Sequence, residues 1–140
     1  MKHRPAIVAA LILAAGAATA LAALPRWVPV GRGAGGGMIE IDRSSLNWHS
    51  LQHAVWRIGY SEPKPNGAVG ERNVELIDCD THTSAPISTT SIGPHGEVID
   101  VQSDPESIAR RHLAPPTIGS PGHRVAVNAC RLRPPRPKRR

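Results

Sequence analysis

The sequence predicts an α+β fold, because strand-like segments come first and helix signals appear only late in the chain. The clearest strand is His53–Tyr60, in which apolar side chains alternate between the two faces. The clearest helix signal is Ser120-Pro121, a capping residue followed by proline at the first helical position. Cys79 and Cys130 offer one covalent link between these two parts of the chain.

The first 22 residues have the pattern of a secretory signal peptide. A basic start at Lys2 and Arg4 precedes an uncharged, alanine-rich run that ends in two A-x-A sites. We therefore expect cleavage near Ala20 or Ala22 and export from the cytoplasm. The alternative is an uncleaved anchor, since the run is long enough to span a bilayer, although its alanines contribute little to insertion.

Residues 23–37 are interpreted as a flexible spacer. Prolines interrupt regular strand pairing, and glycines raise the entropic cost of order. Gly31, Gly33 and Gly36 match the pattern G-x-G-x-x-G, but a strand-like segment follows where a dinucleotide site needs a helix. The spacer interpretation is therefore preferred to a nucleotide-binding loop.

The predicted domain spans residues 38–131. Alternation and turn residues predict five strands at 38–43, 53–60, 72–80, 87–92 and 97–101. The last two flank Gly93–Gly96, which reads as a hairpin turn. Both Trp48 and Trp56 are expected in the core, because the chain has few other aromatic residues.

Two helices are predicted after the strands. Asp104 and Pro105 mark the start of a helix at 104–113. Ser120 and Pro121 mark another at 120–130, and its apolar stripe is Val125, Ala126, Ala129 and Cys130. A strand over the same residues is the alternative, since Val125, Val127 and Ala129 also alternate.

The net charge of +6 lies in a C-terminal tail. The last ten residues hold six basic side chains and no acid, which leaves nine Lys and Arg against eleven Asp and Glu in residues 21–130. Prolines and repulsion between like charges predict that residues 132–140 are disordered. The tail supplies the predicted contacts with anionic surfaces: Arg131, Arg133, Arg136, Lys138, Arg139 and Arg140.

The cysteines are expected to form a disulfide, because the count is even and the chain is exported. Free thiols and a metal site at Cys79 and His82 are alternatives, and zinc would need further ligands nearby. His49 and His53 are four apart but lie in a predicted turn and strand. Asp78 and Asp80 are expected on a solvated strand face opposite Cys79.

The sequence motifs predict no enzymatic activity. The sequence lacks the G-x-S-x-G, H-E-x-x-H and P-loop patterns. We therefore expect no catalytic residues, no cofactor and no metal.

The order of the segments resembles the bacterial surface-adhesin E family. The matching text includes Ala54–Tyr60, Glu75–Cys79, Gly93–Ile99, Ile118–Gly122 and Val127–Cys130. The resemblance implies an antiparallel sheet packed by a C-terminal helix, in a non-enzymatic protein of the bacterial periplasm or cell surface. The chain also departs from the family pattern, because it has no lipid-anchoring cysteine, has Ser91-Ile92 before the turn and adds the basic tail.

The expected function is an exported binding or interaction module of the cell envelope. Its expected partner is a protein or an anionic envelope component, namely lipid, lipopolysaccharide or acidic glycan. The alternative is a structural or accessory periplasmic protein held to anionic surfaces by its tail. Nucleic acid is not an expected physiological partner, because the chain is exported.

Overall fold

A computed structural model describes residues 24–140; the predicted signal peptide, residues 1–22, lies outside the described residues. Six strands form one sheet: β1 (Trp27–Arg32), β2 (Met38–Asp42), β3 (Leu51–Gly59), β4 (Gly70–Asp78), β5 (Thr83–Ile92) and β6 (Val98–Ser103). A short 3-10 turn, Arg43–Ser45, follows β2, and the helices are α1 (Glu106–Arg111) and α2 (Pro121–Leu132). The predicted α+β class, with a C-terminal helix, is confirmed.

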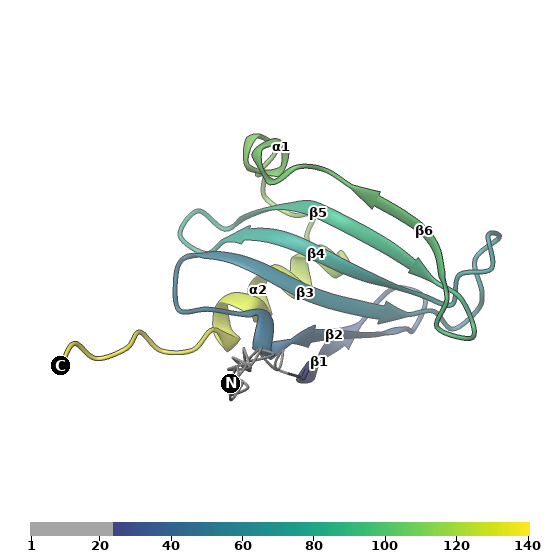
Figure 1. The fold of residues 1–140 in the computed structure, drawn as a ribbon, viewed down its shortest axis with the longest axis horizontal. Helices are drawn as coiled ribbons and strands as arrows, with labels where there is room; N and C mark the ends of the chain where they lie inside the picture. Colours follow the sequence, from purple (N-terminus) through teal and green to yellow (C-terminus); the bar gives the residue numbers. More distant parts are fainter. Residues whose placement is uncertain (1–23) are drawn as a thin grey trace, which may run out of the picture.

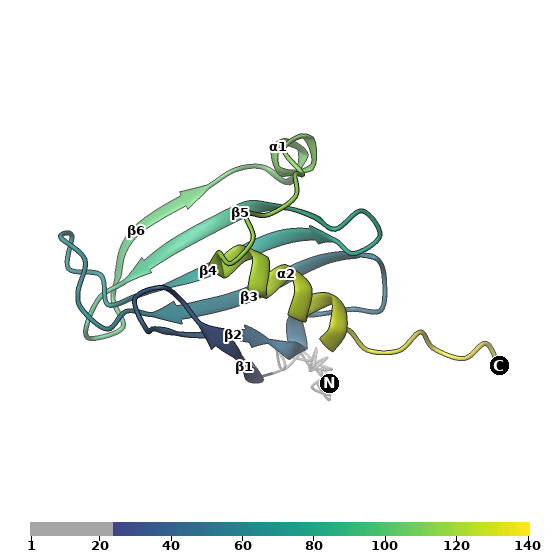
Figure 2. The same ribbon diagram turned by 180° about the vertical axis from the view of Figure 1, so that it is seen from behind.

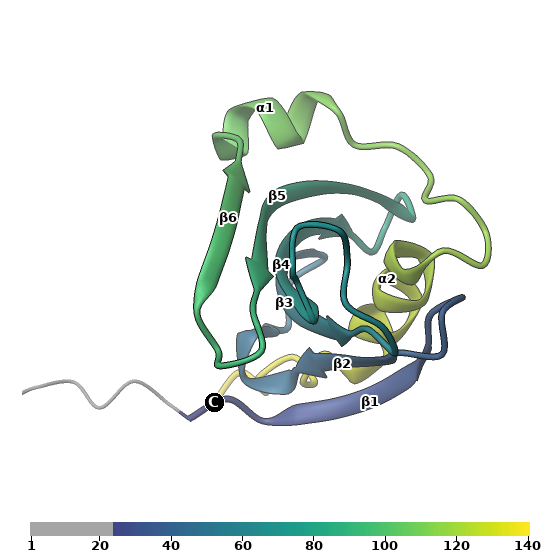
Figure 3. The ribbon, with the colours of Figure 1, turned by 90° about the vertical axis from the view of Figure 1, so that its right-hand side faces the viewer.

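The sheet is an antiparallel meander in which each strand pairs with the next along the chain. Figures 1 and 2 show α2 lying across one face of the sheet, with α1 beyond the end of β6. Seen from the side, the sheet curves around α2 (Figure 3). Side chains alternate between the two faces of a strand, so each face of the sheet has its own hydrophobic cluster. Leu76 and Ile77, which are neighbours in β4, enter different clusters on opposite faces.

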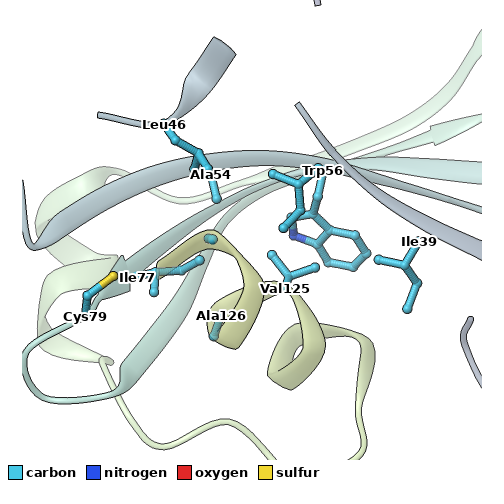
Figure 4. Close-up of a cluster of buried hydrophobic side chains, with 10 residues drawn as sticks. Ile39, Leu46, Ala54, Trp56, Ile77, Cys79, Val125 and Ala126 are labelled. Carbon is cyan, nitrogen blue, oxygen red and sulfur yellow. The ribbon is translucent and has the colours of Figure 1, made fainter. Parts of the chain in front are cut away.

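The larger core lies between the sheet and α2 (Figure 4). The buried residues that form it are Ile39, Ile41, Leu46, Ala54, Trp56, Ile77, Cys79, Val125, Ala126 and Ala129. The stripe predicted on α2 is therefore the face that meets the sheet. Ser120 caps this helix as predicted, because its side chain accepts a hydrogen bond from the backbone N–H of His123. A smaller core of Leu76, Ala85 and Ala109 lies under α1.

The spacer interpretation of residues 23–37 is wrong for most of that segment. Trp27–Arg32 forms β1, which pairs with β2 along the edge of the sheet. An edge strand pairs on one side only, so it tolerates Pro29, and a bulge follows between Pro29 and Gly31. The glycine-rich residues then form the turn into β2, where Gly36 donates its backbone N–H to the Gly33 carbonyl.

Several predicted boundaries also change. β3 starts at Leu51 and β5 at Thr83, both earlier than expected, while β4 ends at Asp78. Helix α1 is shorter than predicted, and its N-cap is Pro105, with no capping bond from a side chain. The folded domain therefore runs from Trp27 to Leu132, which packs against the larger core.

Glu75 is a buried carboxyl group in the sheet face that meets α2. It accepts a hydrogen bond from the Trp56 indole N–H at 3.0 Å, and the Ser84 hydroxyl also bonds to it. Burial nevertheless raises the pKa of Glu75 above its ordinary range, because the charged form loses water. A raised pKa in the folded state means that folding favours the protonated form. Its contribution to stability is thus present at acid pH and is lost as the pH rises through the folded-state pKa.

The change Glu75→Gln is expected to remove this loss of stability at higher pH, because glutamine stays neutral and its carbonyl can still accept a hydrogen bond from the Trp56 indole N–H. Urea unfolding between about pH 4 and about pH 8 should show the variant gaining stability over the wild type as pH rises. Glu62→Gln, in an exposed loop, is the matched control and should leave the profile unchanged. Parallel profiles for Glu75→Gln and the wild type would contradict this account.

Candidate functional site

The basic residues at the C-terminus were predicted to form one loose tail, and the structure divides them. Arg131 lies in the last turn of α2, and Arg133 follows the helix directly. The other four basic residues, from Arg136 to Arg140, lie in an exposed segment without regular secondary structure. That segment leads away from the sheet in Figures 1 and 2. The tail therefore begins at Arg133 rather than at Leu132.

The start of the tail rests on the loop before β3. Arg133 Nη1 donates a hydrogen bond to the His49 carbonyl at 3.2 Å. The Arg136 guanidinium lies 5.3 Å from the centre of the Trp48 ring, which stacks on the His49 ring. Trp48 was expected in the core, but over a third of its surface is exposed. It instead forms part of a surface that receives the tail through cation–π contact.

The predicted Cys79–Cys130 disulfide is present and joins the turn after β4 to the last turn of α2. Both sulfurs are committed to this bond, so the alternative of a metal site on Cys79 and His82 is excluded. His53 bonds to the Glu106 carboxylate at 2.9 Å and so connects β3 to α1. Together with Arg110, His53 lowers the pKa of Glu106.

The other His and Asp pairs that the sequence offered as alternatives do not gather into a site within residues 24–140. In the part of the chain that the structure describes, no three His, Cys, Asp or Glu side chains gather as metal ligands would. Asp78 and Asp80 lie at the β4–β5 turn, where the Asp78 carboxylate accepts the backbone N–H of Asp80 at 2.9 Å. This contact shapes the turn that ends with His82, which has a left-handed backbone (φ 56°).

A groove of about 610 Å³ lies beside the disulfide. One wall is formed by α2 along the border between its buried and exposed faces, where groove-lining residues recur every three or four positions: His123, Ala126, Val127, Cys130 and Arg131. The opposite wall is the connection from α1 to α2, with Pro115, Pro116 and Ile118. Ile77 and Cys79 of the β4 region form the floor.

The α1–α2 connection is held in place by pairing with the sheet. Ala114 and Ser84 exchange two backbone hydrogen bonds, which brings the start of the connection beside β5. Ser120 then begins α2 with its capping bond to His123. The α1–α2 connection, which forms one wall of the groove, is thus held in place at both of its ends.

The groove combines apolar walls with positive charge. Ile118 is 86% exposed and Val127 is 46% exposed, so both walls leave apolar surface in water. His82 and Arg133 join His123 and Arg131 among the lining residues, and none of the described residues that line the groove is Asp or Glu. Neither Arg131 nor Arg133 forms an ion pair within residues 24–140. Such a site suits a molecule that is apolar along its length and negative at one end.

Sequence reasoning identified Cys79, Cys130, Arg131 and Arg133 but missed the groove. His82 and Ile118 are far apart in the sequence, and the fold brings them together. One signal was available, since Val127 lies outside the buried stripe of α2 and so leaves an apolar side chain on the outer face.

No family model, curated protein or solved structure matches this chain. Within the described residues, neither helix is long and apolar enough to cross a membrane.

Proposed function

We propose that the protein is an exported, non-enzymatic binding module of the bacterial cell envelope, and that its C-terminal basic segment contacts an anionic envelope component. The observation that carries the proposal is the end of α2, which passes directly into an exposed segment with basic side chains and no acid. The disulfide supports export, because such bonds persist in oxidising compartments. The resemblance to surface-adhesin E is part of this proposal; the fold that it implies, an antiparallel sheet packed by a C-terminal helix, is the fold observed.

Electrostatics explains why this segment suits an anionic surface. Its prolines hinder regular folding and its basic side chains are exposed, so they can approach lipid phosphates, lipopolysaccharide or acidic glycans. Each Lys or Arg near an anionic membrane contributes about 1 kcal/mol, and salt screens this attraction. The alternative, a structural or accessory protein held to the surface by the same tail, differs in that the folded body binds no ligand of its own.

Deleting residues 134–140 is expected to weaken binding to phosphatidylglycerol vesicles by roughly a thousandfold, because four basic side chains are lost. Vesicle sedimentation at increasing salt should also show the intact protein detaching steeply. The matched control removes four exposed arginines from the folded body by substitution with Gln: Arg43, Arg72, Arg111 and Arg124. It should bind much more tightly than the deletion variant.

Equal vesicle binding with and without residues 134–140 would contradict the proposal. So would a fall of many degrees in melting temperature, since that would make the segment part of the fold. A pull-down from envelope extracts with both forms of the protein then identifies the component that depends on the segment.

A further inference from the structure

We propose that the groove between α2 and the α1–α2 connection binds one fatty acid, with its chain along α2 and its carboxylate at Arg131 and Arg133. The inference goes beyond the proposed function, because it gives the folded body a ligand that does not depend on residues 134–140. It rests on the lining of the groove, its charges and the backbone groups around it.

The walls favour a hydrocarbon chain. Ile118 and Val127 lie on opposite walls and are 86% and 46% exposed to water, while Ile77 and the disulfide form an apolar floor. A chain between the walls would remove apolar surface from water on both sides, which is the main driving force for binding in such a site. Between His123 and Arg131 the helix rises about 12 Å, so the groove has an elongated apolar path.

The backbone around the groove disfavours an extended peptide. A peptide that adds to a protein surface as a strand needs unpaired N–H and C=O groups. Pro115 and Pro116 have no N–H, the backbone of α2 is paired within the helix, and Ile77 lies in a strand with neighbours on both sides. A hydrocarbon chain requires none of these groups.

The charges place the carboxylate at the end of α2. Arg131 and Arg133 have no acidic partner among the described residues, and a guanidinium can hold a carboxylate through two parallel hydrogen bonds. The C-terminal end of a helix carries about half a negative charge. Two full positive charges exceed it, so an anionic head is still attracted to this end.

The volume suits a single chain. About 610 Å³ lies within the usual range for sites that bind small molecules. The groove has one apolar path between two walls, so a lipid with two chains would leave one of them in water. We therefore assign a free fatty acid rather than a membrane phospholipid.

The test measures binding of dodecanoate, below its micellar concentration, to the full chain by equilibrium dialysis. Saturable binding of one molecule is expected. Burying a methylene contributes about 0.8 kcal/mol, so affinity should rise roughly three- to fourfold for each carbon added between octanoate and dodecanoate. No saturable binding, or equal affinity along this series, would overturn the proposal. Tighter binding of lysophosphatidylglycerol than of dodecanoate would overturn the carboxylate assignment.

Two pairs of variants locate the ligand. Ile118→Glu puts a negative charge in an exposed position on the groove wall and should weaken dodecanoate binding at least tenfold, whereas Val98→Glu, an exposed valine on β6, should not. Arg131→Gln with Arg133→Gln should also weaken it at least tenfold, whereas Arg139→Gln with Arg140→Gln should not. An unchanged affinity in Ile118→Glu, with an unchanged melting temperature, would overturn the location.

The tail and the groove are separated by crossing the two assays. Deleting residues 134–140 should leave dodecanoate binding intact while vesicle binding is lost. Ile118→Glu should do the reverse. Loss of dodecanoate binding in the deletion variant would show that the ligand sits on the tail, contrary to this inference.

Discussion

Breaking the Cys79–Cys130 disulfide is expected to lower the free energy of unfolding by about 4 kcal/mol. The bond closes a loop with a sequence separation of 51, and a loop of that length restricts the unfolded chain by this amount in the chain-entropy model. Small domains are stable by only about 5–15 kcal/mol, so the loss is a large share of the total.

Urea unfolding followed by tryptophan fluorescence measures the effect. The reduced protein and the double variant Cys79→Ala with Cys130→Ala should both unfold at lower urea than the oxidised protein. The reduced protein keeps both sulfur atoms, whereas the double variant lacks them. If both lose the same free energy of unfolding, the loss is due to the missing cross-link and not to the removal of sulfur from the core. A difference below about 1 kcal/mol between oxidised and reduced protein would show that the sheet and α2 hold together without the bond.

The disulfide also connects stability to the groove. It anchors α2 to the end of β4, and both cysteines line the groove. Opening the bond should therefore loosen the floor between Ile77 and α2. We expect dodecanoate affinity to fall in the reduced protein even under conditions where the protein remains folded.

The sequence was sufficient to predict the centre of the fold. In β3 the alternation around Ala54 and Trp56 identifies the buried face, and both side chains are buried in the structure. For α2 the alternation of Val125, Val127 and Ala129 also permitted a strand. The local chemistry of Ser120 decides the matter, because its side chain satisfies an N–H that only a helix leaves free.

The candidate site was only partly predictable, for a physical reason. Charge and cysteine content identified the tail and the disulfide, which are local properties of the sequence. The groove arises where the α1–α2 connection passes beside α2, so His82, Ile118 and Arg131 meet only through tertiary structure. The place of Trp48 was mispredicted for a related reason, since its partner Arg136 lies far along the chain.

The first strand was missed because its composition is that of a linker. Pro29 and the glycines have a low propensity for strands, which favoured a linker when the segment was considered alone. In the folded protein the segment pairs with β2, and this pairing stabilises the strand. The turn between the two strands places Gly37 directly against β3. A Cβ atom built on Gly37 would overlap the carbonyl oxygen of Gly59, so this position is restricted by space.

The change Gly37→Ala is accordingly expected to lower the free energy of unfolding by about 3 kcal/mol, the upper part of the range for overpacking, because backbone cannot move aside as a side chain can. Gly35→Ala is the matched control in the same turn: its Cβ would lie 3.9 Å from Ser61 Oγ, and the change should cost no more than about 0.5 kcal/mol. Urea unfolding gives both values, and hydrogen exchange should show β1 opening first in Gly37→Ala. If residues 23–37 were a flexible spacer, the two variants would behave alike. Equal stabilities would therefore contradict the close approach of Gly37 to Gly59, whereas a large difference would show that the end of the β1–β2 turn is packed against β3.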